Sequence, residues 1–271
     1  MVSLCKAYWQ FFLAQGLLLG IGMSFIAIPA SGMVPRYFKR NRGLASGVTV
    51  AGSSFGGVIW PIVFDQLLHH DSISFPWAMR AAGFIMLPLC AICILTIRLP
   101  VVQRMTGPEE LGDVSTFEEV KEDKKKKDLS VLRKPPFALL CLGEFVAVFG
   151  FFAPLFYVST YAVGLGMSPS LAFYLVSIAN GASSFGRILP GIVADRFGRF
   201  NMLVLSAFTA GLIAFCWTAA TSVAGLIIWT AAYGFASGAI LSMQLACATT
   251  LVDEESAGAA IGTVMGSMSL A

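Results

Sequence analysis

Long apolar stretches separated by short clusters of charge dominate the pattern of this chain. Charged residues are absent, or reduced to one, across residues 7–35, 43–64, 77–97, 135–186 and 200–252. Because a helix that crosses a bilayer needs about 20 apolar residues, the first three stretches each hold one span and the last two hold two spans each. The pattern therefore predicts seven membrane-spanning helices.

Turn residues mark the points where the longer stretches divide. The segment 164–169 reads Gly-Leu-Gly-Met-Ser-Pro, and a polar Thr-Ser pair lies within 220–222; both are typical of turns. The last stretch, residues 256–271, would reach roughly 24 Å as a helix, which is shorter than a hydrocarbon core of about 30 Å. We expect it to be the beginning of an eighth helix.

The connections between the spans alternate in charge. Basic residues gather after the first, third and fifth spans, at 36–42, 98–127 and 196–199, whereas the connection at 69–71 carries two His and one Asp. Since cytoplasmic loops of membrane proteins are enriched in Lys and Arg, we expect the odd-numbered connections in the cytoplasm and the N-terminus outside.

The spans and the charge pattern divide the chain into three segments. Residues 1–98 hold three spans, residues 99–134 form a charged cytoplasmic loop, and residues 135–271 hold four spans and a partial fifth. The loop mixes acidic and basic residues and is poor in aromatic ones, which is typical of a flexible linker. The predicted fold class is an all-α, polytopic membrane protein.

Composition narrows the classes of function. The chain is 57% hydrophobic and 12% charged, with a net charge of +3, which excludes an ordinary soluble domain and offers no basic patch for nucleic acid. The six Cys lie in or beside apolar runs, and His69 and His70 are adjacent. Because the sequence shows no cluster of metal ligands, no nucleophile beside a base and no glycine loop for ATP, we expect no enzyme activity, metal or cofactor.

One boundary between apolar stretches carries a motif. Gly191, Asp195, Arg196, Gly198 and Arg199 are spaced as in G-x-x-x-D-R-x-G-R, and charges this dense must lie where the membrane meets water. The pattern resembles the short loop motif of the major facilitator superfamily of secondary transporters. That resemblance implies a helical bundle that works by alternating access, with the three charged residues as a cytoplasmic latch that rearranges between states.

A short repeat indicates where the chain would lie in that family. The segment 43–47 resembles the segment 258–262, with Gly, Ala and Gly at matching positions. In the superfamily the two six-helix halves are parallel repeats. Under this resemblance the chain looks like helices four to ten with part of helix eleven, so we expect an incomplete bundle from a truncated chain.

Longer segments carry a narrower resemblance. Residues 10–16, 37–45, 52–61, 156–162 and 180–201 resemble fungal proteins of the monocarboxylate-porter branch. The resemblance implies transport of a small organic anion such as a monocarboxylate, with a proton as the co-transported ion. Some fungal members sit in secondary-metabolite gene clusters, so secondary-metabolite export is an alternative.

The partners implied by the resemblance are a small-molecule substrate and the lipid bilayer, and not nucleic acid. The implied location is the plasma membrane or the vacuolar membrane. A non-transporting remnant or a membrane sensor is the alternative from another class, and the missing helices favour it because half a bundle cannot line a cavity between two halves.

Two ionisable residues inside spans are the sharpest candidates for a substrate site. Animal members of the monocarboxylate-porter branch carry an Asp four residues before an Arg in their eighth helix. Arg187 matches the Arg, whereas Ser183 stands at the Asp position. Arg187 would bind a substrate carboxylate with its planar guanidinium; alternatively it reaches the interface or pairs with Asp195. Glu144 would exchange a proton or contact a cation, or it bonds to neighbouring backbone.

Further polar and small residues complete the set of candidates. Gln15, Asn180, Tyr157 and Tyr161 are candidates for lining the substrate cavity, with interhelical hydrogen bonds and core packing as the alternatives. A stripe of glycines is expected to let helices pack closely. It consists of Gly43, Gly47, Gly52, Gly56 and Gly57.

Overall fold

The computed structural model describes residues 2–38, 41–70, 73–96, 134–252 and 256–271, and within these ranges the chain is helical and contains no strand. The helices are, in chain order, α1 (Tyr8–Phe11), α2 (Leu19–Tyr37), α3 (Arg42–Asp65), α4 (Phe75–Thr96), α5 (Pro135–Gly164), α6 (Pro169–Phe197), α7 (Arg199–Phe215), α8 (Val223–Thr250) and α9 (Ala257–Met268). A π-helical stretch, Phe12–Leu18, joins α1 to α2 in one continuous span. The all-α class is confirmed, and the charged loop expected at 99–134 lies outside the described residues up to residue 133.

Six helical segments in the described part of the chain are long and apolar enough to cross a membrane. They are Tyr8–Val34, Gly43–Leu68, Phe75–Thr96, Pro135–Gly164, Arg199–Ala219 and Val223–Thr250. The expected seventh, α6, has 29 residues and is long enough, but it is less apolar. It packs between α3 and α8, and a helix that faces protein on two sides needs less apolar surface toward lipid.

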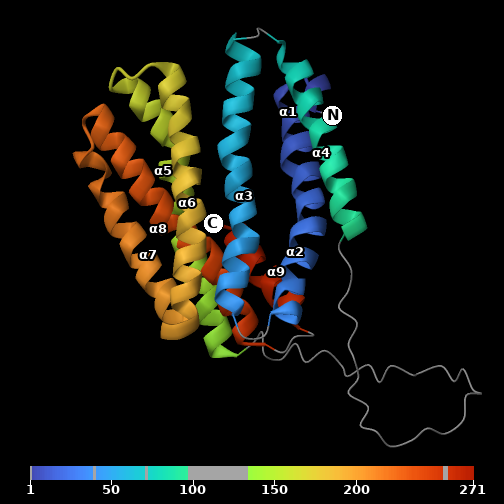
Figure 1. Ribbon diagram of the computed structural model, residues 1–271, viewed down its shortest axis with the longest axis vertical. Helices are drawn as coiled ribbons and strands as arrows, with labels where there is room; N and C mark the ends of the chain where they lie inside the picture. Colours follow the sequence, from blue (N-terminus) through green and yellow to red (C-terminus); the bar gives the residue numbers. More distant parts are fainter. Residues whose placement is uncertain (1, 39–40, 71–72, 97–133, 253–255) are drawn as a thin grey trace, which may run out of the picture.

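The central helix of the bundle is α6. It runs along α3 on one side and α8 on the other, and α5 and α7 complete its group (Figure 1). On the far side of α3 lie α2 and α4 (Figure 1). The short α9, which ends after 12 residues, contacts α2, α5 and α8 and so joins the two groups.

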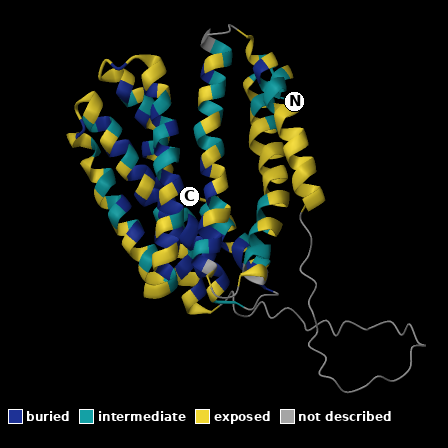
Figure 2. Ribbon diagram, viewed as in Figure 1, coloured by how far each residue is buried: buried dark blue, intermediate teal, exposed yellow. Residues whose placement is uncertain are grey.

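Burial differs strongly between these helices. More of α8 is buried than of the other candidate spans, whereas α2 and α4 are exposed along most of their length (Figure 2). Their exposed side chains include Phe25, Phe84 and Ile94, which the hydrocarbon of a bilayer would cover. The protein core therefore lies around α6 and α8.

The turns fall where the sequence predicts them. Between α5 and α6, Gly166 has φ 85°, a conformation that favours glycine, and the Ser168 hydroxyl accepts a hydrogen bond from the backbone N–H of Leu171 at 3.4 Å. Between α7 and α8, the Ser222 hydroxyl accepts one from the backbone N–H of Gly225 at 3.1 Å. Both serines cap the helix that follows, as expected for this residue at a helix start.

Candidate functional site

Glycines bring α3 and α6 into backbone contact. A Cβ atom added to Gly43 would lie 2.6 Å from the carbonyl oxygen of Gly191, and one added to Gly191 would lie 2.6 Å from the carbonyl oxygen of Gly43. A Cβ on Gly47 would overlap the carbonyl oxygen of Arg187, and one on Gly57 would overlap the side chain of Asn180. These glycines therefore set the distance between the two helices, as small residues do in membrane bundles.

The predicted glycine stripe divides into two sets. Gly52 has no atom within 4 Å of an added Cβ, and Gly56 meets one only on Trp60, in its own helix. At 100° per residue, Gly47 lies about 40° around the helix from Gly43, whereas Gly52 lies about 180° away, on the opposite face. Spacings of four and ten residues, from Gly43 to Gly47 and from Gly47 to Gly57, select the packed face. The expectation that Gly52 and Gly56 pack against another helix differs from what the structure shows.

Asp195 binds the first turn of α3. Its carboxylate accepts hydrogen bonds from the backbone N–H of Gly43 at 2.9 Å and of Leu44 at 3.0 Å. The first N–H groups of a helix have no partner within the helix, and the helix dipole favours an anion there. An acid near the end of α6 thus caps a helix that begins more than 150 residues earlier in the chain.

The two arginines of the motif lie near this contact and have different surroundings. Nη2 of Arg199 lies 3.7 Å from Oδ1 of Asp195, and its Nη1 donates a hydrogen bond to Oγ1 of Thr250 at 2.8 Å. Arg196 is exposed and lines, with Asn41, a surface cavity of about 420 Å³. Gly198, with φ 95°, makes the sharp turn that allows α7 to begin directly after α6.

Arg187 inserts its guanidinium between α6 and α3. The residue is 6% exposed, and Nη1 donates hydrogen bonds to the carbonyl oxygen of Val50 at 2.6 Å and to Oγ of Ser53. Among the described residues its Nε has no partner. The side chain of Arg187 neither reaches an exposed surface nor pairs with Asp195. The geometry therefore matches neither of the two structural alternatives, which were a reach to the interface and an ion pair with Asp195.

Asn180 and Asp65 extend the polar contacts along the same interface. The amide of Asn180 donates to the carbonyl oxygen of Val176 in its own helix at 2.9 Å, while its side chain lies against Gly57. Asp65, which the sequence analysis did not select, is buried and accepts hydrogen bonds from the hydroxyls of Tyr174 at 3.2 Å and Ser170 at 3.5 Å. The sequence does contain a signal that could have identified Asp65, because it is the acidic residue that ends the apolar stretch 43–64.

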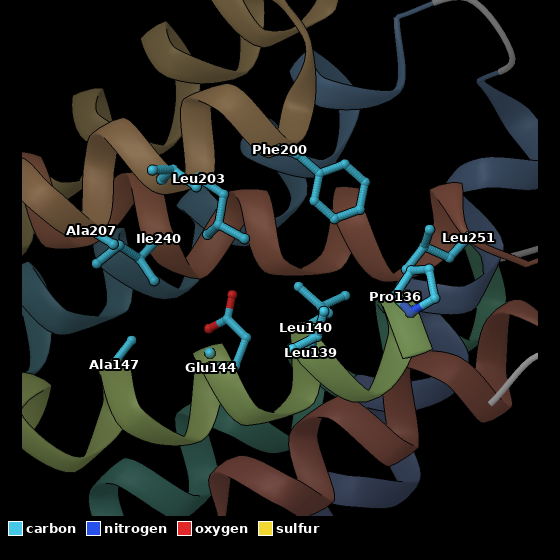
Figure 3. A pocket seen from close by; sticks show the side chains of 12 residues that line it. Pro136, Leu139, Leu140, Glu144, Ala147, Phe200, Leu203, Ala207, Ile240 and Leu251 are labelled. Atoms are coloured by element: carbon cyan, nitrogen blue, oxygen red, sulfur yellow. The ribbon is translucent and has the colours of Figure 1, made fainter. Parts of the chain in front are cut away.

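Glu144 lies apart from these residues, among α5, α7 and α8 and away from the contact between α3 and α6. It is 3% exposed and lines a cavity of about 490 Å³ between α5, α7 and α8 (Figure 3). Its Oε2 has no hydrogen-bond partner among the described residues. Glu144 and Arg187 are therefore not brought into one site, because they occupy different helix interfaces.

The remaining candidates do not gather around a cavity. Gln15 and Tyr157 are exposed on the surface of their helices. Tyr161 packs edge-on against Trp217, with ring centroids 5.5 Å apart, and Trp217 in turn stacks on Trp229 at 5.1 Å. This packing matches the alternative in which Tyr161 belongs to the core.

The chain belongs to the Major Facilitator Superfamily, because the family's sequence profile matches residues 1–271. It is 45% identical over its whole length to the agnestins efflux protein AgnL12 of Paecilomyces divaricatus, 42% identical to an MFS-type transporter of Aspergillus fumigatus, and 37% identical to the aspyridones efflux protein apdF of Emericella nidulans. The resemblance to the superfamily and to fungal transporters is confirmed.

These relatives are longer than this chain, and their names differ in what they say of a substrate. The chain spans 58%, 63% and 52% of the lengths of these three relatives. Two of the three names concern efflux, of agnestins and of aspyridones, and none concerns a monocarboxylate. The narrower monocarboxylate-porter branch therefore stays a prediction.

Proposed function

We propose that this protein takes part in the export of a small organic secondary metabolite by alternating access. Membership of a transporter family and the similarity to two named efflux proteins support this substrate class. The observation that carries the mechanism is the hydrogen bonding of Asp195 to the first turn of α3. It ties the helical segment before the central loop to the segment after it.

Asp195 is suited to act as a reversible contact. Its two hydrogen bonds go to backbone N–H groups at the start of a helix, and a side-chain cap of this kind contributes about 0.5–2 kcal/mol. The hydrogen bonds lie at the end of α6 and the start of α3, where the charged motif meets water. Water can therefore hydrate the carboxylate and the N–H groups once the two helices separate. In this proposal the contact stabilises one state of the transporter, and its loss accompanies opening on that side.

A second candidate substrate class is an organic anion, favoured by one observation on Arg187. Its guanidinium is buried beside α3, and Nε has no partner among the described residues. If α3 and α6 separate, the donors now held by Val50 and Ser53 would be free for a carboxylate, which guanidinium binds with two parallel hydrogen bonds. Ser183 stands four residues before Arg187, where animal members carry an Asp. Arg187 therefore lacks the neighbouring Asp that would couple transport of an anion to a proton.

The test of export is deletion of the gene in its source organism. Compounds inside the cells and in the medium are compared by mass spectrometry with those of the parent strain. Export predicts that one compound or a related group falls in the medium and rises in the cells. Unchanged distribution of every detected compound would contradict the proposal.

Complementation then separates the two candidate substrate classes. The gene is restored as wild type, as Asp195→Ala or as Arg187→Met. Both classes predict reduced export by Asp195→Ala. Only an anionic substrate predicts that Arg187→Met abolishes export of acidic compounds while neutral compounds are still exported.

A further inference from the structure

The cavity between α5, α7 and α8 lies away from the contact between α3 and α6. Its volume of about 490 Å³ falls within the range of about 300–1,000 Å³ that is usual for small-molecule pockets. Eleven of its twelve lining residues are apolar or glycine, and the exception is Glu144. An apolar enclosure with a single polar group is the usual design of a site that orients a lipophilic molecule.

The cavity opens on an apolar surface. Leu139 of α5 and Val204 of α7 line it and are 67% and 68% exposed. An opening lined by apolar side chains admits a molecule with an apolar body. This favours lipophilic molecules as ligands.

The carboxyl group of Glu144 points into the cavity. Figure 3 shows it projecting from α5 into the space bounded by Leu203 of α7 and Ile240 of α8. The side chain is 97% buried, and its Oε2 has no hydrogen-bond partner among the described residues. A buried acceptor without a partner is destabilising, so a ligand that supplies a donor would remove that penalty.

We infer that this cavity binds a lipophilic amine, with the protonated nitrogen on Glu144 and the apolar body between α5, α7 and α8. An ammonium group supplies both the missing donor and the opposite charge, and charge-assisted hydrogen bonds are about twice as strong as neutral ones. A hydroxyl supplies only the donor, and an anion would be repelled by the carboxylate. The inference concerns binding and holds whether or not the chain exports the molecule.

Three probes of matched shape test the site on the full chain purified in detergent. They are naphthylethylamine, naphthylethanol and ethylnaphthalene, and their binding at pH 7 is measured by equilibrium dialysis against protein-free micelles. The amine should bind about 10-fold more tightly than the alcohol, because it adds a charge-assisted bond. The hydrocarbon should bind most weakly.

Two variants assign the binding to this cavity. Glu144→Gln keeps the size of the side chain and an acceptor oxygen but removes the charge, so the amine should lose its advantage over the alcohol. Gly143 has no atom within 4 Å of an added Cβ, so Gly143→Leu fills the cavity and should weaken all three probes. Gly83 of α4 also has open surroundings, and Gly83→Leu is the matched control that should leave binding unchanged.

Equal binding of amine and hydrocarbon to the wild type would overturn the inference, because the cavity would then be a crevice for lipid chains. Amine binding that is unchanged in Glu144→Gln would also overturn it. If Glu144→Gln does not yield a monodisperse protein, the two leucine variants decide: loss of amine binding in Gly143→Leu alone supports the site, and retention in both contradicts it.

Discussion

The two ends of the contact between α3 and α6 are built differently, although each uses one acid. At the start of α3, Asp195 of α6 accepts hydrogen bonds from the backbone of Gly43 and Leu44. At the other end, Asp65 of α3 accepts them from side-chain hydroxyls of α6, those of Tyr174 and Ser170. The helices run antiparallel, so each acid meets the N-terminal part of the partner helix, where the dipole favours a negative charge.

This difference determines how each end can change. No substitution other than proline removes a backbone N–H group, so the contact of Asp195 depends mainly on the acid and on how closely the helices approach. The contact of Asp65 depends on the identity of its hydroxyl partners and can be weakened one group at a time. An acid–backbone contact therefore reports helix separation more directly, which suits it to a conformational role.

The largest expected effect comes from the glycines between the two ends. Gly47→Leu should destabilise the protein by about 3 kcal/mol, because its side chain would overlap the backbone of α6 at Arg187. Thermal unfolding in detergent measures the change. Gly52→Leu is the matched control on the opposite face and should be neutral or slightly stabilising, since Leu is a better helix former than Gly by about 0.8 kcal/mol. Equal losses in both variants would contradict the assignment of the packed face.

A smaller effect is expected from Asp195→Ala, which removes the cap of α3. Losing a side-chain cap costs about 0.5–2 kcal/mol, and the variant should also increase labelling of Leu44→Cys by a water-soluble maleimide in a background without the native Cys. Asp195→Asn, which keeps one acceptor, should fall between wild type and Asp195→Ala. Unchanged labelling in both variants would show that the contact does not hold the helices together.

Tyr174→Phe should have a smaller effect still, because Asp65 keeps its other partners. A slight decrease in the unfolding temperature is expected, with no change in the labelling of Leu44→Cys at the opposite end. Tyr157→Phe, at an exposed tyrosine on α5, is the control for loss of a hydroxyl. A decrease in Tyr174→Phe as large as that of Asp195→Ala would make the two ends equivalent.

The smallest effect is expected from Arg199→Gln. The distance of 3.7 Å to Asp195 and the partial exposure of both side chains make this a screened ion pair, which contributes about 0.5 kcal/mol. The loss should disappear when the unfolding temperature is measured at high salt. A larger loss that persists at high salt would indicate that the bond to Thr250, and not the ion pair, is the important contact.

Much of the fold could be predicted because its causes are local. Pro169 and Ser168 begin α6, and Ser222 begins α8, at the turn residues that divide the apolar stretches. The sequence predicted α6 as a span as well, although its polar residues give it a weaker apolar signal than the other long helices. Those residues, Ser177 and Arg187 among them, bond to α3, which no local pattern reveals.

The candidate site could be predicted only in part. The motif located Asp195 and Arg199 at a helix boundary, but it did not identify α3 as the partner of Asp195. Residue type selected Arg187 and Glu144, yet their placement in separate interfaces, and the role of Asp65, required the arrangement of the helices. Only the glycines on one face of α3 contact α6. The sequence does not show which face of that helix meets its neighbour.

The sequence by itself determined that this chain is a set of membrane-spanning helices with a charged boundary motif, because the exclusion of charge from hydrocarbon acts on each residue separately. It also carried the family, through the spacing of that motif. The tertiary structure alone decided which helix receives Asp195, which face of α3 packs, and that Glu144 lines an apolar cavity of its own. Those features arise only when groups that are far apart in the chain come into contact in the folded protein. Hydrogen bonds and close packing act only at contact distance, so a local sequence pattern does not contain them.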